Sequence, residues 1–187
     1  MKVLVVFDHP RRGSFSGALL DAFLKGLAEA GHEAEVADLY AEGFDPRMPL
    51  ADEPDWDDDD KVYSEAVLAE QARIERNDAI AFLFPVWWWS LPAMTKGWID
   101  RVWNNGWSYG ARKLALDKAL LIGVAANSED GYRKRGYDEA MRVQLLVGIM
   151  NYCGIEKADL ALLYDALETD QIREDMIAEA RRLGRVF

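Results

Sequence analysis

Four short apolar segments and one weakly alternating segment, each separated from the next by a longer stretch, constrain the fold of this chain more than any other feature. Residues 3–7 and 79–84 include no polar side chain, as expected of strands that are covered on both faces. Strands that alternate with helices indicate a mostly parallel sheet with helices on both faces and right-handed crossovers. The expected strands span residues 3–7, 33–39, 79–84, 119–126 and 160–164.

Apolar residues at helical spacing occupy most of the stretches between these strands. After the first strand the pattern continues to Gly31, which is expected to end that helix. A second helix is expected at residues 62–77, and Thr169 or Asp170 is expected to cap the last one. A further helix, ending at Gly154, is predicted from four apolar residues at helical spacing: Met141, Leu145, Ile149 and Tyr152.

Composition limits the functions open to the chain. Its 187 residues, 50% hydrophobic and 29% charged, suit a single domain over residues 1–187. A formal charge of −11 argues against a nucleic-acid surface, which needs clustered Lys and Arg. No apolar run is long enough for membrane insertion or a signal peptide. The single cysteine, Cys153, permits no internal disulfide, favours a cytoplasmic setting and is expected to be a small core residue.

Residues 40–61 interrupt the alternation with a long loop. The loop includes Pro46, Pro49 and Pro54, together with acidic residues at 52, 53, 55 and 57–60. Loops of this length are usually functional or mobile, but this one is expected to be a solvated acidic insertion. It lacks the spacing of a calcium loop, and we expect no metal site in the chain.

Tryptophan is concentrated in residues 84–110. Three consecutive indoles cannot all point into one core, because neighbouring residues face different ways. They could form flat walls for a planar heterocycle, or they could occupy the core or a subunit interface. Ser90 is expected to cap the helix that follows, with Pro92 in its first turn. This stretch contains six of the seven tryptophans: Trp87, Trp88, Trp89, Trp98, Trp103 and Trp107.

The loop after the first strand, residues 8–16, has the components of an anion site. Ser14 and Ser16 offer hydroxyls, and backbone N–H groups enter a helix N-terminus nearby. His9, Arg11 and Arg12 add cationic or donor side chains. A helix cap beside solvated arginines is an equally good interpretation. The loop has neither the Gly-Lys-Ser/Thr of a Walker motif nor the G-x-G-x-x-G of a dinucleotide fold.

The loop after the fourth strand, residues 127–132, is polar and is expected to close over the edge of a ligand. Tyr132 offers a phenolic donor, although an exposed loop tyrosine is the commoner outcome. The basic run at residues 133–135 could attract the phosphates of NAD(P)H, or it could be a solvated turn.

Taken together, these loops resemble those of the flavodoxin-like NAD(P)H:quinone oxidoreductases, which include small subunits of bacterial glutathione-gated potassium efflux systems. The resemblance spans nearly the whole chain, and its most specific part is FPVWWWSLPAMTKGWIDRVW at residues 84–103. The Asp38-Leu39-Tyr40 sequence also matches. The resemblance implies a flavodoxin-like three-layer αβα sandwich with a five-stranded parallel sheet of order 2-1-3-4-5.

The resemblance also implies roles for particular residues. The flavin phosphate would be held by His9, Ser14, Phe15 and Ser16. The isoalloxazine would be bordered by Pro85, Val86, Trp88, Trp89, Asn127 and Ser128. The substrate pocket would comprise Trp88 and Trp89 together with Trp107 and Tyr109, which in dimeric relatives reach the flavin of the partner subunit; Trp103 would join the same dimer face.

The chain departs from the family pattern at two places. Ala126-Asn127-Ser128-Glu129 replaces the usual Thr-Thr-Gly-Gly, whose glycines let the backbone approach the flavin closely. The mammalian relatives pair a tyrosine with a histidine beside the flavin, and these catalytic positions fall at Tyr132 and Asp138. An aspartate at neutral pH accepts hydrogen bonds and donates none unless its pKa is raised.

The resemblance predicts a flavin-dependent NAD(P)H oxidoreductase that reduces a quinone or similar flat acceptor and forms a homodimer. The short C-terminal part favours FMN over FAD as the cofactor, with NAD(P)H as co-substrate. Two other functions stay open: an electron-carrier flavodoxin, which the acidic surface would suit, and a flavin-binding regulatory subunit of a membrane potassium efflux system.

Overall fold

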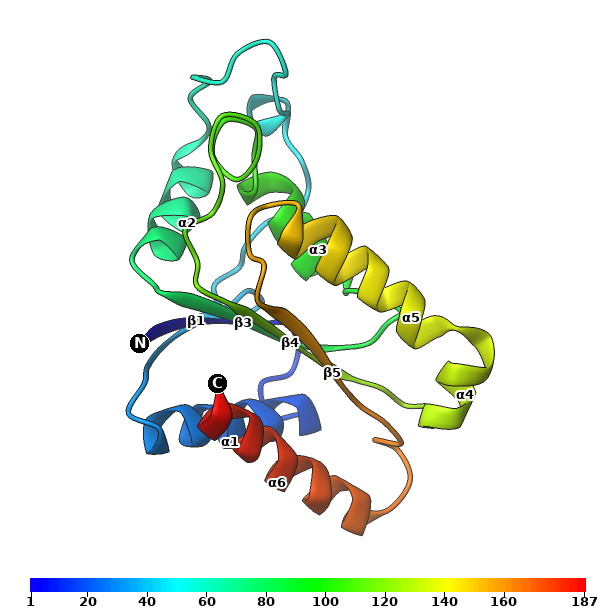
Figure 1. Ribbon diagram of the computed structural model, residues 1–187. Helices are drawn as coiled ribbons and strands as arrows, with labels where there is room; N and C mark the ends of the chain where they lie inside the picture. Colours follow the sequence, from blue (N-terminus) through cyan, green and yellow to red (C-terminus); the bar gives the residue numbers. More distant parts are fainter.

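A five-stranded parallel sheet forms the centre of the molecule. The computed structural model describes all 187 residues, and the strands lie in the order β2-β1-β3-β4-β5 (Figure 1). The family's expected strand order is therefore confirmed. The strand bounds are β1 Lys2–Phe7, β2 Glu33–Asp38, β3 Ala79–Pro85, β4 Ala119–Val124 and β5 Ala158–Leu163.

Helices cover both faces of the sheet, as the alternating pattern predicted. On one face lie α1 (Phe15–Glu29) and α6 (Asp170–Val186), and on the other lie α2 (Glu65–Glu75), α3 (Ala93–Val102) and α5 (Tyr137–Arg142) (Figure 1). Val3, Val5 and Phe7 pack toward α1 and α6, whereas Leu4 and Val6 pack toward the opposite layer, because successive strand residues face opposite ways. No helix is both long and apolar enough to cross a membrane.

The helix after the tryptophan run begins later than expected. Pro92, in extended conformation, precedes the first residue of α3, and Ser90 does not cap it. A residue before proline is disfavoured in helical conformation, so the helix cannot start at Leu91. Ser90 instead pairs with Trp87 in a tight turn.

The polar loop expected at residues 127–132 is largely a short helix, α4 (Glu129–Arg135). Ser128 caps it by accepting a hydrogen bond from the N–H of Gly131, and Gly136 ends it with a φ of 71°. The sequence carried these cues, since acidic residues occupy the first turn and basic residues the last.

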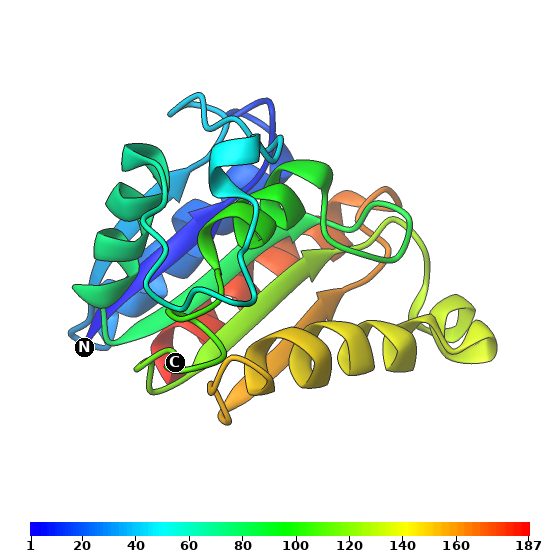
Figure 2. The same ribbon diagram turned by 90° about the horizontal axis from the view of Figure 1, so that it is seen from above.

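The helix predicted to end at Gly154 has a different geometry. α5 continues into a π-helical segment, η2 (Val143–Asn151), which runs along the edge of the sheet at β5 (Figure 2). A π-helix bonds residue i to residue i+5, so Met150 follows Leu145 into the core in place of Ile149. Tyr152, expected on the buried stripe, is 57% exposed.

The acidic insertion is not wholly solvated. It includes a 3-10 turn, η1 (Leu50–Asp52), and the carboxylate of Asp52 is fully buried. Asp52 forms an ion pair with Arg101 of α3 at 2.7 Å and accepts hydrogen bonds from the N–H and hydroxyl of Ser64. We call residues 40–61 the strap, because this pair fastens them across α3.

Candidate functional site

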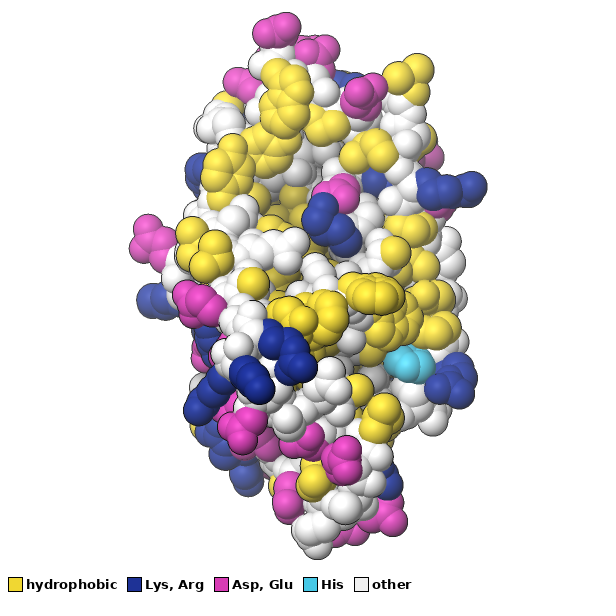
Figure 3. All heavy atoms as spheres, turned by 90° about the vertical axis from the view of Figure 1, so that its right-hand side faces the viewer, with side chains coloured by type: hydrophobic (Ala, Val, Ile, Leu, Met, Phe, Trp, Pro, Cys, Tyr) yellow, Lys and Arg dark blue, Asp and Glu magenta, His cyan; other side chains and the backbone are white.

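The loops that follow β1, β3 and β4 meet at the carboxyl edge of the sheet, where ligands bind in open α/β folds. This edge faces the viewer in Figure 3, on the side of the molecule where α4 and α5 lie. Hydrophobic side chains gather across the middle of that face (Figure 3). The sequence correctly identified these three loops as neighbours.

The loop after β3 is a strained turn centred on Trp88 and Trp89. Trp87 and Ser90 close it with two backbone hydrogen bonds, of 3.3 and 3.1 Å. The φ angles of Trp88 and Trp89 are 54° and 55°, the type I′ pattern that normally calls for Asn-Gly. A left-handed conformation costs a residue with a side chain about 1–2 kcal/mol. Such strain persists only where the surrounding structure enforces it, and it clusters at functional sites.

This turn presents both ring faces and backbone donors. Trp88 is 87% exposed, and neither its N–H nor that of Trp89 has a hydrogen-bond partner in the chain. Trp89 is half-buried and stacks on Tyr137 with ring centroids 4.1 Å apart. The turn can therefore contact a flat ligand with its indoles and bind the polar edge of that ligand with main-chain N–H groups.

A cavity of about 370 Å³ opens beside Trp89, which is large enough for part of a cofactor-sized ligand. The loop after β4 and helix α4 supply most of its wall. Its lining residues are Trp89, Asn127, Ser128, Gly131, Arg135 and Tyr137. Tyr137 was not expected from the sequence, where its only signal is an aromatic residue directly after the helix-ending Gly136.

The loop after β1 has the expected cap and two free donors. Ser14 accepts a hydrogen bond from the N–H of Gly17, which leaves the N–H groups of Phe15 and Ser16 without an intrahelical acceptor. An anion placed at this end of α1 would meet those donors and the positive end of the helix.

The basic side chains of this loop differ in their hydrogen-bond and ion-pair partners. Arg12 is held by Asp21 and by the carbonyl of Gly17, so it supports the loop. Arg11 has no carboxylate partner. The Nδ1 of His9 accepts the N–H of Arg11 at 3.0 Å, which leaves the ring proton of a neutral imidazole on Nε2 as a donor.

Asp8, the first residue of this loop, is buried and was not predicted from the sequence to be a site residue. Its Oδ2 accepts the N–H of Thr95 at 2.8 Å and the Thr95 hydroxyl, joining β1 to the first turn of α3. Its Oδ1 has no partner, and only 1% of the residue is exposed. Burial raises the pKa of the Asp8 carboxyl despite the hydrogen bonds from Thr95.

The two expected catalytic residues do not line the cavity. Tyr132 is 3% exposed, and its ring meets Tyr137 and Tyr164 edge-on at 5.9 and 5.1 Å. Burial raises the pKa of the Tyr132 phenol. Asp138 is half-buried at the start of α5, and its charge adds to the burial that raises the pKa of Tyr164.

Trp107 and Tyr109 lie away from the cavity within this chain. The indole N–H of Trp107 donates to Glu75 at 2.8 Å. Tyr109 packs between Trp56 and Tyr152, and burial raises the pKa of its phenol to about 12. Trp103, expected with them on a dimer face, is 4% exposed beside Phe82 and Trp98, and it lines a second, apolar cavity together with Tyr109.

Comparison with known proteins agrees with this architecture. A family model described as flavodoxin-like fold matches residues 1–184. The chain is 34% identical to the uncharacterized NAD(P)H oxidoreductase YcaK of Escherichia coli (strain K12), over 90% of this chain and 86% of that protein. It is 30% identical to the ribosyldihydronicotinamide dehydrogenase (quinone) of Pongo abelii, over 100% of this chain and 92% of that one.

A solved structure of an NAD(P)H:quinone oxidoreductase has the same fold. The NAD(P)H:quinone oxidoreductase from Methanothermobacter marburgensis superposes with a TM-score of 0.95 at 36% identity, covering 99% of this chain and 94% of that one. The chain therefore belongs to the flavodoxin-like NAD(P)H:quinone oxidoreductase family.

Proposed function

We propose that the protein is a flavin-dependent oxidoreductase that takes hydride from NAD(P)H and reduces a quinone or similar flat acceptor. The strained Trp88–Trp89 turn beside the cavity carries this proposal, because it offers aromatic walls and unpaired N–H donors at one place. A bound flavin would supply the reversible hydride chemistry, and the protein would bind and orient it.

The residues present fit a flavin mononucleotide. Phe15 and Ser16 would bind its phosphate through their N–H groups, with His9 and Ser14 completing the cradle. Pro85 and Val86 lead from β3 into the turn of Trp88 and Trp89, which would border the ring system. Asn127 and Ser128 would border it from the opposite wall of the cavity. We favour FMN over FAD because the chain supplies one cradle for one phosphate.

Tyr132 takes a supporting role in this proposal, and we assign no step to Asp138. The burial of Tyr132 behind Tyr137 suits a residue that supports the Trp89–Tyr137 stack. We expect Tyr132→Phe to change kcat by less than about twofold, since the ring and its packing are retained. A loss of activity of 100-fold or more would instead indicate that Tyr132 contacts the flavin or the substrate directly, as the resemblance implies.

We also propose a homodimer. An apolar cavity of about 430 Å³ lies over α3 and η2, and Trp103, Tyr109 and Tyr152 are among its lining residues. Tyr152 in its lining is 57% exposed, and Val147 outside its lining is 60% exposed. Hydrophobic side chains also gather along the upper part of the face in Figure 3. A second copy covering this surface would let Trp107 and Tyr109 approach its flavin site.

The dimer is tested by placing a charge on this surface. We expect Tyr152→Glu to convert dimer to monomer in sedimentation and to weaken flavin binding. The matched control is Leu167→Glu, which alters an exposed apolar residue at 76% exposure outside the surface. A wild-type monomer that binds flavin and turns over substrate would contradict the proposed dimer.

The acidic surface, with a formal charge of −11, favours an electron carrier as the second candidate function. Both candidates require a flavin, so the first experiment is to denature the purified protein and identify any released cofactor by mass. A protein that releases no flavin and binds none would refute both. Steady oxidation of NAD(P)H with a quinone by the purified protein alone would exclude the carrier. The single cysteine leads us to propose a reducing, cytoplasmic setting.

A further inference from the structure

Arg135 is the only ionised side chain in the wall of the cavity beside Trp89. It forms no ion pair, although the chain has 33 acidic residues for 22 basic ones. Its neighbour Arg133 is instead neutralised by Glu129 at 2.6 Å. An unpaired cation in the wall of a cavity, on a protein of net negative charge, indicates a site that binds a negatively charged group.

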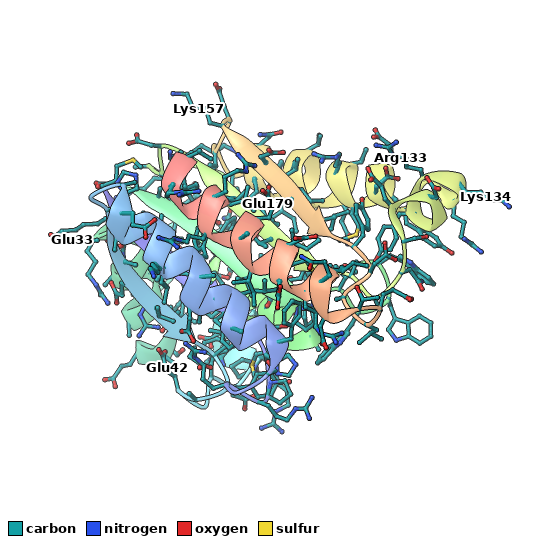
Figure 4. All side chains as sticks on the ribbon, turned by 90° about the horizontal axis from the view of Figure 1, so that it is seen from below. Glu33, Glu42, Arg133, Lys134, Lys157 and Glu179 are labelled. Carbon is teal, nitrogen blue, oxygen red and sulfur yellow. The ribbon has the colours of Figure 1, made fainter.

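The conformation of Arg135 directs its charge at the cavity. Its Nη1 donates to the carbonyl of Gly131 at 3.1 Å, so the side chain runs back along α4 toward Ser128. A Cβ built at Gly131 would lie 3.8 Å from that nitrogen, which is van der Waals contact distance, so the guanidinium lies directly against Gly131. Arg133 and Lys134 project outward from α4 (Figure 4). Of the three basic residues, only Arg135 lines the cavity.

The other groups around the cavity leave this charge without compensation. Trp89 and Tyr137 contribute aromatic rings, and Asn127 and Ser128 contribute neutral polar groups. Of the two acids in the first turn of α4, Glu129 is paired with Arg133, and neither it nor Asp130 lines the cavity.

The proposed function supplies a group that becomes negative there. A bound flavin would accept hydride from NAD(P)H, which would leave as NAD(P)⁺. The reduced ring system would then carry one negative charge that the oxidised ring system lacks. A cation in the wall therefore binds the reduced ring more strongly than the neutral oxidised ring.

We propose that Arg135 sets the redox equilibrium of the bound flavin by stabilising its anionic reduced form. This inference rests on the proposed function. Neither Tyr132 nor Asp138 lines the cavity, so Arg135 is the one source of positive charge in its wall.

The test compares Arg135→Gln with Lys134→Gln in the flavin-loaded protein. Both variants remove one positive charge from the same exposed helix, but only Arg135 lines the cavity. We expect Arg135→Gln to weaken binding of the reduced flavin relative to the oxidised flavin about 10- to 100-fold, the range for a hydrogen bond to a charged group. For a two-electron couple this lowers the midpoint potential by about 30 to 60 mV.

Two control variants define the outcome. Lys134→Gln should leave the potential unchanged and bind oxidised flavin within about twofold of the native protein. Arg135→Lys should restore part of the potential lost in Arg135→Gln. A potential for Arg135→Gln equal to that of Lys134→Gln overturns the proposal.

One specific alternative also overturns it. If the potential is unchanged while the preference for NADPH over NADH falls, the guanidinium binds a phosphate of the donor instead. Failure of the proposed function is distinguishable from all these results, since that protein would bind no flavin at all.

Discussion

Asp8 and Asp52 are both buried carboxylates, yet their surroundings are opposite. Asp52 in the strap is 0% exposed and has three donors, from Arg101 and from the N–H and hydroxyl of Ser64. Burial opposes its ionisation, but the hydrogen bonds from Arg101 and Ser64 outweigh burial and lower its pKa.

Asp8 at the carboxyl edge is 1% exposed and uses only one of its oxygens. Burial dominates the hydrogen bonds from Thr95, so the pKa of Asp8 is raised. The nearby Trp88–Trp89 turn is also locally unfavourable, with two positive φ angles. Both carboxylate oxygens of Asp52 in the strap thus accept hydrogen bonds. The proposed site instead has an unpaired carboxylate oxygen and two strained φ angles, as expected where function competes with stability.

The largest expected effect is the loss of the buried ion pair in the strap. Arg101→Met should lower the free energy of unfolding by about 3–5 kcal/mol in urea denaturation, because it leaves the Asp52 carboxylate buried and uncompensated. Replacing Asp52 by Leu in the same chain should recover part of that loss. The control Arg133→Met removes an exposed pair with Glu129 and should cost at most about 0.5 kcal/mol. If the Arg101→Met protein were as stable as that control, Arg101 would not stabilise the buried Asp52 carboxylate, and the contrast with Asp8 would be wrong.

A smaller effect is expected at the strained turn. Trp88→Gly should raise the unfolding free energy of the flavin-free protein by up to about 1 kcal/mol, because glycine adopts positive φ without strain and the exposed indole makes few contacts. The same change should weaken flavin binding about tenfold through lost ring contact.

The matched control for this turn is Asp165→Gly. Asp165 also has positive φ, at 63°, but does not line the cavity. Flavin affinity, measured by fluorescence titration, should be unchanged in this control. If Trp88→Gly bound flavin as well as the native protein, the strain would have no link to the site.

The smallest effect is a difference in pH dependence between the two aspartates. The native pKa of Asp8 is raised, so the native state holds its proton longer, and its contribution to stability falls as pH rises from the unfolded pKa through the native pKa. Asp8→Asn should therefore gain stability relative to the native protein as pH rises through that interval.

Asp52 should show the opposite sign. Its native pKa is lowered, so its contribution is present above the unfolded pKa and is lost as pH falls through the native pKa. The native protein should therefore gain stability relative to Asp52→Asn as pH rises. Urea denaturation of the three proteins between about pH 2 and pH 8 covers the interval below the ordinary aspartate pKa for Asp52 and the interval above it for Asp8. Slopes of equal sign would contradict the comparison.

The sequence alone determined the framework of this protein and the sheet edge at which we propose its site. Apolar runs such as residues 3–7 and 79–84 can only be buried on both faces, and the alternation with helices then requires parallel strands whose loops meet at one edge. The three unusual loops were therefore identifiable before their geometry was known.

Only the tertiary structure decided which side chains share a cavity and which carboxylates are satisfied. Arg135 reaches the cavity because α4 and its bond to Gly131 direct it there, while Tyr132, three residues earlier, is turned into the core. Asp52 finds Arg101 49 residues away along the chain, and Asp8 finds Thr95 87 residues away. Periodicity reports which face of an element is apolar, but contacts between distant segments depend on how those elements pack together.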